Sequence, residues 1–222
     1  MTTWGAGAYL GIMLPVEFGT LGTFTLAALA VVMTPSPDTV LISRHTLVSG
    51  RAAGLATVAG VQVGLLGHTI IAISGISVLI AASPLAFKAV TIVGAFYLAW
   101  LGVSAIRDAS ALALNIEGTQ TGLLTAGRQV ALTNLLNPKV ILLFLTLFPN
   151  FIVTGQDNET TQLLTLATTF TIINTIWQAP IALAANLIRR WLASDIIRRR
   201  ISIASGVIFI GFAIGLLVQH LI

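Results

Sequence analysis

Two charged residues interrupt long apolar stretches at matching points of the two halves of the chain. Asp38 follows Pro35-Ser36-Pro37, and Lys139 follows Asn137-Pro138, 101 positions later. A carboxylate can carry a proton or hold a cation, whereas an ammonium group can hold a carboxylate. An ionisable residue among membrane spans is costly unless it is paired or hydrated, so it is a functional candidate by default. Polar breaks at corresponding points of two halves indicate a transporter's binding site.

The composition indicates an integral membrane protein. Of the 222 residues, 56% are hydrophobic and 8% are charged, whereas a soluble domain carries about 25% charged residues. The uncharged runs 52–87, 160–188 and 201–222 are longer than the roughly 20 residues that cross a bilayer. These runs lack the alternation of a barrel strand, so we expect an all-α fold.

We expect six transmembrane helices, at residues 20–43, 55–80, 86–106, 128–150, 163–188 and 201–221. The alternative is five spans with a re-entrant or interfacial segment. Met1–Leu14 has no Lys or Arg before its apolar part, which argues against a signal peptide. Residues 1–18 are therefore interpreted as an outward-facing N-terminal segment, and residues 19–222 as a single transmembrane transport domain.

The positive charges indicate the orientation. Arginines gather in the expected loops 44–54, 107–128 and 189–200, and the N-terminus and loop 151–162 have no Lys or Arg. The positive-inside rule places the arginine loops in the cytoplasm, with both termini outside the plasma membrane. The net charge of +4 then reflects orientation and anionic lipid, and we expect no nucleic-acid partner.

The two halves align as a repeat. Pro37-Asp38-Thr39-Val40-Leu41 corresponds to Pro138-Lys139-Val140-Ile141-Leu142, although chance similarity over so few residues is the alternative. Three spans per half would start the second half on the opposite side of the membrane, so the repeats, about 19–106 and 128–222, would be inverted. Their first helices would be broken at Pro35-Pro37 and at Asn137-Pro138 because proline interrupts a helix.

The breaks predict roles for the residues around them. Pro37 and Pro138 suit the first position of a new half-helix, whose free N–H groups favour an anion such as a carboxylate. We assign proton coupling to Asp38, and binding of the substrate carboxylate to Lys139 or to these half-helix starts. A structural ion pair between Asp38 and Lys139 is the alternative. Because a cation is unfavourable at a helix N-terminus, Lys139 needs a nearby anion.

Other polar residues within the spans are weaker candidates. Asn174 and Gln178 are candidates for lining the substrate path, and His68 for relaying protons. Interhelical hydrogen bonding is the alternative for these residues, as it is for Gln62 and Asn134. The faces Gly60-x-x-x-Gly64 and Gly211-x-x-x-Gly215 predict either close packing within the bundle or the seam of a homodimer.

Four motifs, in order along the chain, carry a resemblance to a known family. They are Thr34-Pro35-Ser36-Pro37-Asp38, Gly50-Arg51-Ala52-Ala53-Gly54, Gly94-Ala95-Phe96-Tyr97-Leu98-Ala99-Trp100-Leu101-Gly102, and Leu135-Leu136-Asn137-Pro138-Lys139 with Phe148-Pro149-Asn150-Phe151. They resemble the motifs of the LysE/Rht translocator family, bacterial exporters of amino acids. Ser36 is a departure, because the family has glycine between the two prolines. The resemblance implies efflux of neutral or basic amino acids from the cytoplasm in exchange for protons.

Two other functions remain open at this stage. Metal or other cation export would favour clusters of Cys, His or carboxylate groups, yet the chain has no cysteine and three histidines. An intramembrane enzyme built on His68 and Ser74 would need the base within reach of the nucleophile, and the two lie six residues apart. We expect no cofactor and no metal site. The chain has no phosphate-binding loop, which leaves a proton gradient as the simplest energy source.

Overall fold

The computed structural model describes residues 15–34, 36–82, 84–107, 119–153, 158–184 and 194–221. The expected all-α fold is confirmed, because these residues form helices and no strand. The expected N-terminal segment lies largely outside the described residues. The elements are α2 (Phe18–Met33), α3 (Pro37–Ser49), α4 (Arg51–Ala82), α5 (Pro84–Arg107), α6 (Leu123–Leu135), α7 (Pro138–Thr146), the 3-10 helix η1 (Phe148–Phe151), α8 (Glu159–Leu183) and α10 (Asp195–Leu221).

Both expected helix breaks are present. α2 and α3 meet at an angle of 54°, and α6 meets the segment from Pro138 to Phe151 at 51°. Pro37 and Pro138 each occupy the start of the following half-helix. Asn137 caps α7, since its side-chain oxygen accepts a hydrogen bond from the Lys139 backbone N–H at 3.0 Å. Ser36 has an extended backbone (φ −138°), so the replacement of glycine there causes no backbone strain.

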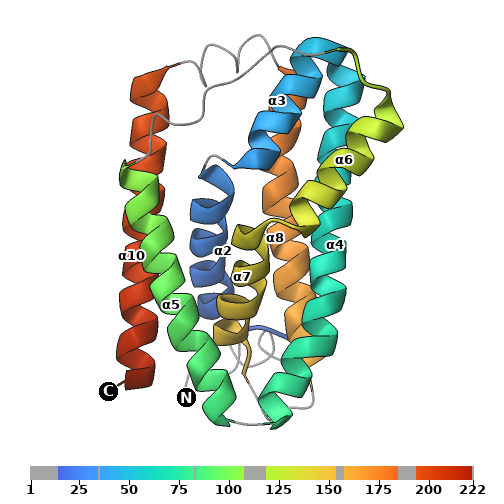
Figure 1. Ribbon diagram of the computed structural model, residues 1–222. Coiled ribbons are helices and arrows are strands. Elements are labelled where there is room, and N and C mark those ends of the chain that lie inside the picture. The colour runs from blue at the N-terminus through green and yellow to red at the C-terminus, as the bar shows by residue number, and fades with distance from the viewer. Residues whose placement is uncertain are drawn as a thin grey trace, which may run out of the picture.

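The two broken pairs run in opposite directions through the bundle (Figure 1). In that view α2 leads upward into α3, whereas α6 leads downward into α7. α4 packs along α6 and α8, and α10 packs along α5 and α2. The interior is therefore built from two broken helices of opposite direction. The inverted repeat itself stays a prediction.

The described helices differ in whether their length and hydropathy suffice to cross a membrane. Arg51–Gly75 of α4 and Arg199–Val218 of α10 are long and apolar enough to cross a membrane, and each bent pair also qualifies if it counts as one span. The other two expected spans correspond to α5 and α8. The helix expected over 163–188 instead runs from Glu159 to Leu183 and contains Pro180, and residues 185–188 lie outside the described part.

The described charges are distributed unevenly between the two ends of the bundle, with Lys88 near the start of α5 and Asp195 at the start of α10 as exceptions. The described chain begins and ends at the same end (Figure 1), where Glu17 and Glu159 lie at the starts of α2 and α8. The arginines lie toward the opposite end, where α3 and α5 finish and α4, α6 and α10 begin: Arg44, Arg51, Arg107, Arg128, Arg199 and Arg200. At that end Gly50 adopts a positive φ of 89°, which glycine tolerates, and joins α3 to α4.

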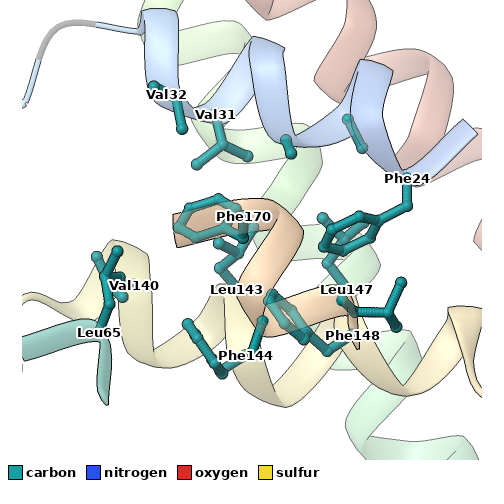
Figure 2. Packing of buried hydrophobic residues seen from close by; sticks show 14 of the residues in the cluster. Phe24, Val31, Val32, Leu65, Val140, Leu143, Phe144, Leu147, Phe148 and Phe170 are labelled. Carbon is teal, nitrogen blue, oxygen red and sulfur yellow. The ribbon is translucent and has the colours of Figure 1, made fainter. Parts of the chain in front are cut away.

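An aromatic cluster joins α2, α7, η1 and α8 on one side of the breaks (Figure 2). Phe144 and Phe148 stack with ring centroids 4.2 Å apart, and Phe24 meets Phe148 edge to face at 5.1 Å. Phe170 of α8 contacts both Phe144 and Phe148. Such contacts add to the energy of burial and hold the half-helices of the two halves in place.

The two glycine faces have different surroundings. A Cβ added to Gly60 would strike the Gly127 backbone, and one added to Gly64 would strike the Asn134 side chain. This face therefore serves the close crossing of α4 and α6. A Cβ at Gly211 or Gly215 would meet no described atom within 4 Å. For those two glycines, a homodimer seam stays a prediction.

Candidate functional site

The two breaks face a small cavity in the bundle. Its volume is about 20 Å³, which is room for roughly one water molecule. An amino acid would require the surrounding half-helices to separate. The wall combines polar and apolar side chains from both halves: Val31, Val32, Ser36, Asp38, Leu65, Asn134, Asn137, Lys139, Val140, Phe170, Asn174 and Gln178.

Asp38 contributes the carboxylate of the cavity. It lies in the first turn of α3, where the partial positive charge of the helix start favours an anion. Its Oδ2 accepts a hydrogen bond of 2.8 Å from Asn134 Nδ2. Its Oδ1 is buried and has no hydrogen-bond partner within the described protein. One oxygen is thus fixed by the other half of the chain, and one remains available.

Lys139 contributes the ammonium group, held by the end of α2. Nζ donates to the carbonyl oxygens of Val31 at 2.9 Å and Thr34 at 3.4 Å. In an uninterrupted helix the Val31 carbonyl would accept from residue 35, but that residue is proline and has no N–H. The expectation that Lys139 needs an anion was incomplete, because the negative end of the α2 dipole also stabilises a cation.

Asp38 and Lys139 line the same cavity, but each is hydrogen-bonded to different partners. The hydrogen bonds of the Lys139 ammonium group go to main-chain carbonyls, and the hydrogen bond to the Asp38 carboxylate comes from Asn134. Asp38 and Lys139 therefore do not form the alternative, a direct, hydrogen-bonded ion pair between the halves. Both charges are held by dipoles, which leaves each able to meet a ligand group.

His68 supports the second break from α4. Its Nε2 lies 3.0 Å from the carbonyl oxygen of Asn134, and because a carbonyl only accepts, this nitrogen carries the proton. The ring stacks on Phe144 at a centroid distance of 5.5 Å. Asn134 thus joins His68 to Asp38, since its carbonyl accepts from one and its amide donates to the other.

Several polar atoms around the cavity are buried without a partner. In the described protein these include Asp38 Oδ1, Asn134 Oδ1, Asn137 Nδ2 and Gln178 Oε1. Buried polar groups of native proteins are normally hydrogen-bonded, so each exception points to a function or to an unseen partner. The Asn174 side chain has one hydrogen-bond partner, because its Oδ1 accepts from Gln62 Nε2 at 3.2 Å. The cavity therefore offers both free acceptors and a free donor.

The residues expected at the site separate into two groups. Five of them line the cavity: Asp38, Asn137, Lys139, Asn174 and Gln178. Pro37 and Pro138 instead shape the wall from the first positions of α3 and α7, and His68 lies behind Asn134. The sequence predicted Asn134 only as a polar residue that could form interhelical hydrogen bonds. Its position three residues before Asn137, at the end of a broken helix, was the available signal.

Comparisons with known proteins agree with this architecture. The sequence profile described as LysE type translocator matches residues 29–220. The chain is 31% identical over 204 residues to the "Uncharacterized membrane protein YrhP" of Bacillus subtilis, covering 87% of this chain and 96% of that protein. It is 33% identical over 188 residues to an "Uncharacterized membrane protein" of Vibrio cholerae, with 85% and 91% covered.

A further relative carries a functional name. The chain is 29% identical over 214 residues to the "Leucine efflux protein" of Enterobacter sp. (strain 638), covering 92% of this chain and 99% of that protein. No solved structure matches the chain. The profile match covers both helix breaks and nearly all of α10. The chain therefore belongs to the LysE type translocator family, whose members are membrane transporters and not enzymes.

Proposed function

We propose that this protein is a secondary exporter of amino acids from the cytoplasm. The family and the leucine efflux relatives support amino-acid export. The observation that carries the proposal is a single cavity lined by Asp38 and Lys139, one from each broken helix. A carboxylate, an ammonium group and two half-helix starts together can hold both ends of a zwitterion.

The charge balance of the cavity favours a neutral amino acid. Asp38 and Lys139 contribute one negative and one positive charge, and a zwitterion adds no net charge to the closed site. A basic amino acid would add an uncompensated cation in a low-dielectric interior, which is costly. The apolar wall offers a place for an aliphatic side chain: Val31, Val32, Leu65, Val140 and Phe170.

Export is driven by proton antiport in this proposal. Asp38 carries a proton on the return step, after the substrate has left its carboxylate. His68 is the second proton-coupling residue, because Asn134 connects it to Asp38. One charge that moves across 100 mV supplies about 2.3 kcal/mol, which corresponds to nearly two decades of concentration.

Alternating access would follow from the opposed directions of the two broken pairs (Figure 1). In inverted repeats the site lies between halves that exchange conformations, so that it opens to one side and then to the other. We place the arginine-rich end in the cytoplasm of a bacterium and both termini outside the inner membrane. Asn137, Asn174 and Gln178 then complete the substrate site together with the half-helix starts at Pro37 and Pro138.

The test is release of amino acids from cells preloaded with dipeptides. Wild type, Asp38→Asn and Lys139→Ala would be compared at matched expression, with Lys88→Ala as the control, since Lys88 is exposed. We expect faster release of a neutral amino acid by wild type and by the control, and loss of that release in both site variants. Wild-type cells that release no amino acid would contradict the proposal and favour export of metal ions or other cations.

A further inference from the structure

Three of the unpartnered atoms around the cavity are hydrogen-bond acceptors. They are Asp38 Oδ1, Asn134 Oδ1 and Gln178 Oε1, and their side chains are 4%, 1% and 3% exposed. All three residues line the same cavity. A buried acceptor with no donor is expensive, so three together call for a ligand group that donates several hydrogen bonds.

The orientation of two amides around the cavity is set by their other bonds. Asn134 must present Nδ2 to Asp38, because a carboxylate can only accept, and this leaves Oδ1 as the free atom. Asn137 must present Oδ1 to the Lys139 N–H, which leaves Nδ2 free. Among the residues that line the cavity, Asp38 and Asn134 therefore carry free acceptors, and Asn137 carries a free donor.

We propose that Asp38 Oδ1, Asn134 Oδ1 and Gln178 Oε1 form a subsite for the primary ammonium group of the substrate. This inference rests on the proposed function, and it defines the substrate class as primary α-amines. A primary ammonium group has three N–H donors, which equals the number of free acceptors. The substrate carboxylate then lies toward Asn137 Nδ2 and the Lys139 ammonium group.

The charged groups that face the cavity agree with this direction of binding. Asp38 is the negative group, and its Oδ1 is one of the three free acceptors of the cavity lining. Lys139 is the positive group, and its ammonium is bound to the Val31 and Thr34 carbonyls at the end of α2. The reverse direction would place the substrate ammonium beside Lys139 and its carboxylate beside Asp38, so that like charges meet twice.

Other occupants satisfy the three acceptors less well. One water molecule fits the volume of about 20 Å³, but it donates only two hydrogen bonds. A monovalent cation could contact all three oxygens, and it would make binding depend on that ion and not on the substrate amine. Methylation of the substrate nitrogen distinguishes the ammonium group from a bound cation, because it weakens binding only if the nitrogen itself donates to the three oxygens.

The experiment measures competition against labelled leucine transport by the wild-type protein in proteoliposomes. The competitors are leucine and N,N-dimethylleucine, which keeps the charge, the carboxylate and the side chain but has one N–H. Each lost hydrogen bond weakens competition by about tenfold, so we expect the dimethyl compound to be about 100-fold weaker. Equal competition, or dependence on a monovalent cation with no effect of methylation, would overturn the ammonium subsite.

A variant separates lost hydrogen bonds from steric clash of the two methyl groups. In Gln178→Met one acceptor is absent, so leucine should compete about tenfold more weakly than it does in wild type. Competition by the dimethyl compound should stay unchanged, because its one N–H still has an acceptor. The ratio between the two competitors should then fall from about 100 to about 10. An unchanged ratio would overturn the subsite and leave amino-acid export standing. Liposomes that neither transport nor bind any amino acid would overturn both.

Discussion

Lys139, at the start of α7, donates a hydrogen bond of 2.9 Å to the carbonyl oxygen of Val31, in the last turn of α2. The second break is supported in a related way, because His68 of α4 bonds the Asn134 carbonyl near the end of α6. Each half of the chain thus supplies a donor to a helix end of the other half. The helix breaks and the polar contacts between the halves are parts of one arrangement.

Removing the Lys139 ammonium group should destabilise the fold as well as stop transport. Lys139→Met leaves the Val31 and Thr34 carbonyls unpartnered, at about 1–3 kcal/mol for each buried acceptor. For a chain of this length we expect the Tm in detergent to fall by roughly 5–10 °C. Lys88→Met, at an exposed site, is the control and should leave the Tm unchanged. Equal Tm values for the two variants would show that the α2 carbonyls do not depend on Lys139.

The packing of Gly64 against Asn134 should be needed for activity. A Cβ at Gly64 would meet the Asn134 side chain, which in turn holds Asp38. We expect Gly64→Ala to reduce the initial rate of export by about tenfold or more, since displacing Asn134 breaks a hydrogen bond to a charged group. Gly75→Ala in the same helix, where a Cβ meets no described atom within 4 Å, should export at the wild-type rate. Similar export rates for both variants would show that displacing Asn134 does not affect transport.

His68 should affect the pH dependence of transport beyond its structural hydrogen bond. His68→Gln keeps an N–H donor for the Asn134 carbonyl but, unlike an imidazole ring, cannot take up and release a proton. We expect this variant to have a wild-type Tm and a flatter pH profile of export. His68→Leu removes the donor and should lower the Tm. A His68→Gln profile that overlays the wild-type profile would assign His68 a structural role alone.

The orientation can be tested cleanly because the chain has no cysteine. Glu17→Cys and Gln120→Cys place single thiols at exposed positions just before α2 and α6, and these two helices begin toward opposite ends of the bundle (Figure 1). A membrane-impermeant maleimide applied to intact cells should label Glu17→Cys, whereas Gln120→Cys should react only after permeabilisation. Labelling in the reverse order would mean that the arginine-rich end faces outward.

The sequence predicted the elements of the fold better than the contacts between them. Proline chemistry and hydropathy were sufficient to place the two breaks and to identify the neighbouring charges, because both depend on local residues. The end of α8 was predicted several residues too late, at 188 instead of Leu183. Residues 184–188 are uncharged and, apart from Asn186, apolar, so hydropathy alone contained no clear stop signal.

Partner identity could not be predicted from spacing. The sequence suggested an anion, either Asp38 or a ligand, as the partner of Lys139, whereas the Lys139 hydrogen bonds go to the Val31 and Thr34 carbonyls. Main-chain acceptors have no signature of their own, although Pro35 indicated that the Val31 carbonyl would lack a helical donor. Asn134 was undervalued for a similar reason, because its importance comes from contacts with Asp38 and His68, which lie 96 and 66 positions away.

Antiport requires that protons enter as leucine leaves, and this exchange can be measured in one experiment. Proteoliposomes loaded with leucine and an internal pH dye would be diluted into leucine-free buffer, with wild type and Asp38→Asn compared. We predict that leucine efflux through wild type acidifies the interior and that Asp38→Asn shows neither efflux nor acidification. Leucine efflux by wild type without proton entry would contradict antiport. Proton entry through Asp38→Asn at the wild-type rate would contradict the role of Asp38.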